Sequence, residues 1–108
     1  MAFDFDQVLK DALSAGVAAA KPGGKQATDW IRQSGKANAD SLRAIAEGIA
    51  TGQISKDTGA MLLHENERAL QSEAAALSVI VKASAQAGLN AVLASLFGAL
   101  KSALKIAV

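Results

Sequence analysis

The sequence predicts an all-α protein, an antiparallel bundle of three to four helices built on a long αα-hairpin and forming one domain, residues 1–108. The chain contains 25 alanines, the best helix formers, whereas it has no tyrosine, one tryptophan and three phenylalanines. The β-branched cluster at 79–81 lies in an alanine-rich helical context. Because alanine buries little surface, the core of a single chain is thin, and this favours self-association.

The first helix is predicted over 4–21. Asp4 can serve as its N-cap, and Gln7 stands three residues later, where the second half of a capping box is expected. Apolar and small residues then recur at helical spacing, and residues 22–24 (Pro-Gly-Gly) end the helix.

The second helix is predicted over 26–51, and the middle of its apolar line is small and polar. Three interpretations remain open there. Another backbone approaches closely at Gly35, Asn38 makes a buried hydrogen bond that fixes the register, or this face is turned to water.

A tight turn is predicted between the second and third helices. Gly52 suits the left-handed position after a helix end, and Ile54 can supply the apolar contact of the cap. Ser55 is an N-cap for the next helix. The two helices should therefore form an antiparallel hairpin.

The third and fourth helices are predicted over 55–87 and 89–107, with Gly88 between them. Glycine breaks a helix only weakly, costing about 1 kcal/mol relative to alanine. Three outcomes therefore remain open: the third helix ends at Gly88, it kinks there, or it continues through Gly88 as one long helix. The apolar line of the third helix is close to a heptad seam, which suits association with a second chain.

The sequence carries no catalytic signature, and we expect no enzyme, cofactor or metal site. No nucleotide-binding glycine loop or nucleophile motif occurs, and His64 is the only histidine. The polar cluster at 64–68 (HENER) reads as a solvated helix face. The net charge of +1 and the scattered basic residues give no reason to expect nucleic-acid binding, and no small-molecule substrate is indicated.

Hairpin geometry places residue 64 opposite residues 42–43. Arg43 is therefore predicted to pair with Glu65 or Glu67 across the hairpin. Such an exposed pair would contribute about 0–1 kcal/mol.

Charge is distributed unevenly along the chain. All ten acidic residues lie in 1–73, and residues 74–108 contain only lysines as charged groups. The N-terminus is acidic and does not resemble a signal peptide. We therefore expect a cytoplasmic protein, with peripheral membrane association or signal-less export as alternatives.

The last helix has two faces. The polar atoms of Asn90, the serines and the lysines make it too polar for an ordinary membrane span. Its amphipathic pattern suits a core helix, an oligomer interface or a lipid surface. The residues predicted for an interface or lipid face are Leu89, Val92, Leu93, Leu96, Phe97, Leu100, Leu104, Lys101 and Lys105.

These observations favour a helical assembly protein that forms a homo-oligomer or binds a protein partner through alanine- and glycine-rich seams. The alternative is a membrane-active protein, a pore former or lipid-surface coat, that uses the acid-free residues 74–108 to contact membrane lipid.

Overall fold

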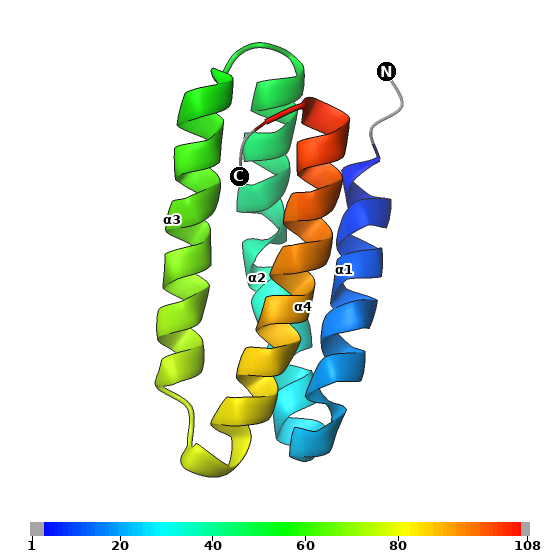
Figure 1. Cartoon of the computed structure of the whole chain (residues 1–108), viewed down its shortest axis with the longest axis vertical. Helices are drawn as coiled ribbons and strands as arrows, with labels where there is room; N and C mark the ends of the chain where they lie inside the picture. Colours follow the sequence, from blue (N-terminus) through cyan, green and yellow to red (C-terminus); the bar gives the residue numbers. More distant parts are fainter. Residues whose placement is uncertain (1–3, 107–108) are drawn as a thin grey trace.

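The computed structural model describes residues 4–106, which form an antiparallel all-α bundle (Figure 1). Within this range, the α-helices are α1 (Phe5–Ala20), α2 (Gly24–Ala50), α3 (Lys56–Ala75) and α4 (Val79–Leu104), and a short 3₁₀ helix, η1 (Lys21–Gly23), joins the first two. The bundle measures 43 × 23 × 20 Å along its principal axes. The predicted all-α class is confirmed.

The N-cap of α1 is Asp4, as predicted. Its Oδ1 accepts a hydrogen bond from the backbone N–H of Gln7 at 3.2 Å. The Gln7 side chain does not complete a capping box, because its Nε2 donates instead to Asp11 at 2.9 Å. The i,i+4 partner on the same helix face therefore replaces the reciprocal cap.

The predicted turn between α2 and α3 is also confirmed. Gly52 has a φ of 80°, in the left-handed region that glycine adopts readily. Ile54 donates its N–H to the carbonyl of Gly48 at 2.9 Å, and its side chain lies over that glycine. Ser55 caps α3 by accepting a hydrogen bond from the N–H of Thr58 at 3.1 Å.

The boundary predicted at Gly88 is wrong. Helix α3 ends at Ala75, a short turn follows, and Ser78 is the N-cap of α4. Gly88 lies inside α4, where a Cβ would come within 2.8 Å of the carbonyl oxygen of Gly16 in α1. This glycine allows two helices to touch and does not end one. The predicted endpoint at residue 107 lies outside the described residues.

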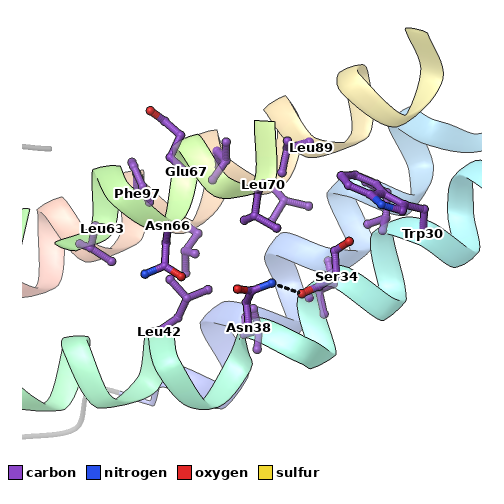
Figure 2. A pocket seen from close by; sticks show the side chains of 17 residues that line it. Trp30, Ser34, Asn38, Leu42, Leu63, Asn66, Glu67, Leu70, Leu89 and Phe97 are labelled. Atoms are coloured by element: carbon purple, nitrogen blue, oxygen red, sulfur yellow. Dashed lines mark hydrogen bonds between the residues drawn. The ribbon is translucent and has the colours of Figure 1, made fainter. Parts of the chain in front are cut away.

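The seam between α2 and α3 is lined by two half-buried amides (Figure 2). Asn38 and Asn66 each donate to the carbonyl four residues earlier in their own helix, at 2.8 and 3.2 Å. Neither of these bonds links two helices, so the register role considered for Asn38 is not supported. At Gly35 the close neighbour is the side chain of Leu13 in α1, not a backbone.

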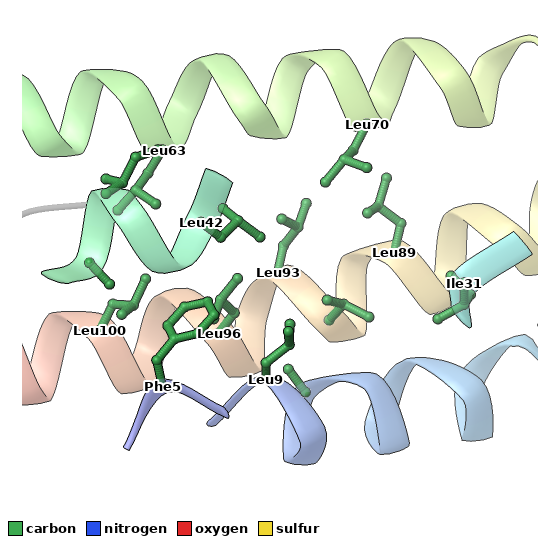
Figure 3. Close-up of a cluster of buried hydrophobic side chains, with 14 of the residues drawn as sticks. Phe5, Leu9, Ile31, Leu42, Leu63, Leu70, Leu89, Leu93, Leu96 and Leu100 are labelled. Carbon is green, nitrogen blue, oxygen red and sulfur yellow. The ribbon is translucent and has the colours of Figure 1, made fainter. Parts of the chain in front are cut away.

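Helix α4 is the centre of the core and packs against each of the other three α-helices (Figures 1 and 3). No contact joins α1 to α3 among the described residues. Phe5 and Leu9 of α1 meet this core from one side, and Leu63 and Leu70 of α3 meet it from the other. The buried residues of α4 are Val81, Ala85, Gly88, Leu89, Val92, Leu93, Leu96, Leu100 and Leu104.

Candidate functional site

The large apolar face of the C-terminal helix, predicted to meet a partner or lipid, is occupied by the chain itself. Six of its members are buried in the bundle: Leu89, Val92, Leu93, Leu96, Leu100 and Leu104. Phe97 is half-buried, with its ring edge-on to His64 at a centroid distance of 5.8 Å. In the folded chain this face is therefore core, because α1–α3 supply enough apolar surface to cover it. Lys101 and Lys105 remain exposed.

The opposite face of α4 forms an exposed stripe, which we call the outer stripe: Ala83, Ala87, Asn90, Ala94, Gly98 and Lys101. The exposed Lys105 follows as the C-cap residue of the helix. At 100° per residue the stripe positions lie within a narrow sector of the helix surface. The stripe has no charged side chain before Lys101. A Cβ added at Gly98 would find no atom within 4 Å, so the surface there is open.

Two large aliphatic side chains are exposed at the start of α4. Val79 is 86% and Ile80 is 87% exposed, whereas Met61, the other exposed large hydrophobic residue in the described range, is 56% exposed. The α3–α4 turn lies at the same end of the bundle as η1 (Figure 1). The side chain of Ser84 in α4 lies directly against Gly23 in η1. This contact brings the start of α4 next to η1. We call this end, residues 21–25 and 76–84, the α3–α4 end.

Sequence analysis missed the exposure of Val79 and Ile80. A third helix continuing to residue 87 places Ile80 on its apolar line. The signal that would have revealed the exposure is Ser78, a good N-cap residue directly before three β-branched residues. A helix beginning at Val79 presents the side chains of Val79 and Ile80 at the end of the bundle, where they stay exposed, while Val81 in the same turn is buried.

Arg43 pairs with α1 and not with α3. Its guanidinium donates to Asp6 at 2.5 and 3.2 Å and to Asp40 at 2.8 Å, and lies 5.8 Å from the ring centroid of Phe5. The hydrogen bonds that Arg43 donates, first to Asp6 and then to Asp40, raise the pKa of Arg43 above its usual value. In residues 4–106 no ion pair joins it to the predicted partners, Glu65 and Glu67. The prediction placed Arg43 on the wrong side of α2.

The HENER cluster forms a local surface pair. His64 Nδ1 lies 3.5 Å from Glu67 Oε1, one helical turn away on α3. Across the described part of the chain, no three His, Asp or Glu side chains group together as metal ligands would. The geometry here is that of a half-buried i,i+3 helix pair. Such a pair contributes a few tenths of a kcal/mol.

A small apolar cavity of about 20 Å³ lies beneath the α2–α3 seam, near Trp30, Leu70 and Leu93 (Figure 2). This volume is close to the minimum that holds one water molecule. Its polar lining residues are Ser34, Asn38, Asn66 and Glu67. The side-chain amides of Asn38 and Asn66 donate hydrogen bonds to carbonyls of their own helices. The cavity is therefore a packing gap and is too small for an organic ligand.

The fold and these surfaces were compared with known proteins. No protein-family model, curated protein or solved structure matches the chain.

Proposed function

We propose that this chain is a non-enzymatic helical assembly protein that self-associates, or docks into a larger complex, through the outer stripe of α4. The observation that carries the proposal is an exposed helix face without charge from Ala83 to Gly98. A helix face that meets only water normally carries charged residues. Small side chains instead allow a second helix to pack closely.

The dimensions of the outer stripe suit a helix–helix contact. From Ala83 to Lys101 it extends about 27 Å at a rise of 1.5 Å per residue. A stable interface buries about 800 Å² on each partner, so flanking residues of neighbouring helices would add to the contact. The lysines at its far end favour a partner that offers carboxylates there.

Light scattering coupled to size-exclusion chromatography tests this proposal. The wild-type chain is expected to show a mass above its 11.0 kDa monomer. Ala94→Glu, in the outer stripe, should shift the mass towards the monomer. Ala44→Glu, at an exposed alanine of α2, is the matched control and should leave the mass unchanged. A wild-type monomer at micromolar concentration that binds no partner would contradict the proposal.

A second candidate function is membrane activity through release of α4. Although its asparagine, serines and lysines suggested that the helix is too polar to span a membrane, Val79–Leu104 is long and apolar enough to cross one by length and composition. In an 18-residue apolar window of this helix, 39% of the residues are buried in the bundle. Release would expose the leucine-rich face to lipid. Dye leakage from vesicles on addition of the full-length chain would support this function, and intact vesicles would argue against it.

A further inference from the structure

We propose that the α3–α4 end binds the surface of an anionic membrane while the bundle stays closed, with Val79 and Ile80 entering the headgroup region. This surface is separate from the outer stripe on the side of α4, so the inference does not depend on self-association. It also differs from membrane activity by release of α4, because the leucine-rich face stays in the core.

The first argument is the exposure of the two aliphatic side chains. Val79 and Ile80 are adjacent, more than four-fifths exposed, and lie in the first turn of α4. Leu77 beside them is half-buried against the core, and Val81 is buried. The apolar pair therefore projects from a fixed base. Inside a lipid interface both side chains would leave water.

The second argument is the charge around the pair. Lys82 follows it directly, Lys21 begins the adjoining η1 helix, and Lys25 lies in the first turn of α2. All three lysine side chains are exposed. The acidic groups nearby in sequence are Glu73 in α3 and Asp29 in α2, and Asp29 pairs with Lys25 and Arg32. Within residues 4–106, Lys21 and Lys82 are therefore the lysines of this end that make no ion pair. Lysines around exposed aliphatic residues match the negative surface of an anionic bilayer.

The third argument comes from the direction of α4. Its N-terminus is at this end, and its N-cap residue Ser78 makes no side-chain capping hydrogen bond. The partial positive charge of the α4 N-terminus lies beside Lys82, whereas the C-termini of α1 and α3 bring the opposite partial charge to the same end of the bundle. The attraction for lipid phosphates is therefore centred on the start of α4.

A second copy of the chain fits this surface less well than lipid does. Two exposed side chains supply far less than the roughly 800 Å² per partner that a stable protein interface needs. Contact between two such ends would also bring their lysines together, which is unfavourable. A lipid surface requires neither a matching shape nor a large contact.

Flotation of the full-length chain with vesicles tests the proposal. The vesicles contain equal parts of phosphatidylcholine and phosphatidylserine, and a second set contains phosphatidylcholine alone. We expect binding to the mixed vesicles that weakens as salt rises. The double variant Val79→Ser/Ile80→Ser should reduce partitioning about 30-fold. Lys82→Gln should reduce it about fivefold on the mixed vesicles only.

The matched control is Met61→Ser, which removes an exposed apolar side chain of α3. This variant should bind like the wild type, and circular dichroism should show the same helicity for all variants. Dye leakage should be absent, because the bundle stays closed. The proposal is overturned if the wild type does not float, if Met61→Ser weakens binding equally, or if flotation survives Val79→Ser/Ile80→Ser. Leakage that accompanies binding would also overturn it, in favour of released α4.

Discussion

Gly88 and Gly98 lie in the same helix and face opposite surroundings. A Cβ on Gly88 would press against the Gly16 carbonyl, Ile31 and Ala20, whereas a Cβ on Gly98 would meet nothing. At Gly88 the missing side chain is a packing requirement. At Gly98 the missing side chain serves no packing contact within the chain, and there it lowers helix propensity.

Alanine substitution should therefore have opposite effects at the two glycines. Gly88→Ala should lower the free energy of unfolding by about 1–3 kcal/mol, because neither the backbone of α1 nor Ile31 has room to move away. Gly98→Ala should raise it by up to about 1 kcal/mol. Urea denaturation of both variants measures the difference. Equal effects at both positions would show that α1 and α4 are not in close contact.

Arg43 gives a second prediction at the scale of single residues. A double-mutant cycle of Arg43→Ala with Asp6→Ala should give a coupling of about 0–1 kcal/mol in the free energy of unfolding, as for an exposed ion pair. The same cycle with Glu65→Ala should give none, since Arg43 points to α1. Coupling to Glu65 alone would restore the pairing predicted from the sequence.

Among the helices, α3 is the least deeply packed. Only Gly59, Leu63, Leu70 and Ala74 are buried among its 20 residues, and it makes no contact with α1 within the described range. The small cavity and the two asparagines of the α2–α3 seam remove further apolar contact from the side of α3 that faces α2. This helix has fewer stabilising contacts to lose when it opens.

Hydrogen exchange should reveal this difference between helices. Backbone amides in the middle of α3 are expected to exchange faster than those of α4 around Leu96, because α3 can detach without exposing the whole core. Mass spectrometry of peptic fragments measures both. Slower exchange in α3 than in α4 would contradict this order of stability.

The caps and the turn that depend only on neighbouring residues could be predicted from the sequence. Asp4, Gly52 and Ser55 act through backbone groups within a few positions, so their roles could be read directly. Gly88 could not be interpreted in this way, because its role depends on Gly16, far away in the chain. The leucine-rich face of α4 was recognised, but whether protein or lipid covers it depends on the packing of three other helices.

For the whole molecule, α4 is the element that holds the bundle together. It contacts α1, α2 and α3, and two of the most deeply buried leucines, Leu96 and Leu100, belong to it. In the described residues α1 and α3 do not contact each other, so without α4 the apolar side chains that they bury against it would be exposed to water. Without α4, the first three helices keep only the α1–α2 and α2–α3 contacts.

A chain of residues 1–78 should consequently fail to fold cooperatively. Its far-ultraviolet circular dichroism should show weak helicity and a thermal transition without a clear midpoint. Leu96→Ala in the full-length chain is the comparison. It should fold but lose about 2–5 kcal/mol of unfolding free energy. A sharp transition in the shortened chain would mean that α1–α3 form an independent unit.

The close contact between α1 and α4 also bears on how the protein is made. These helices are the first and last in chain order, so their contact at Gly16 and Gly88 closes a long loop. Contacts between distant parts of a chain form slowly. Because synthesis proceeds from the N-terminus, α1–α3 emerge from the ribosome before the helix that completes their core. The leucine-rich face of α4 therefore becomes buried only after the whole helix has been synthesised, and until then the apolar faces of α1–α3 that it covers stay in contact with water.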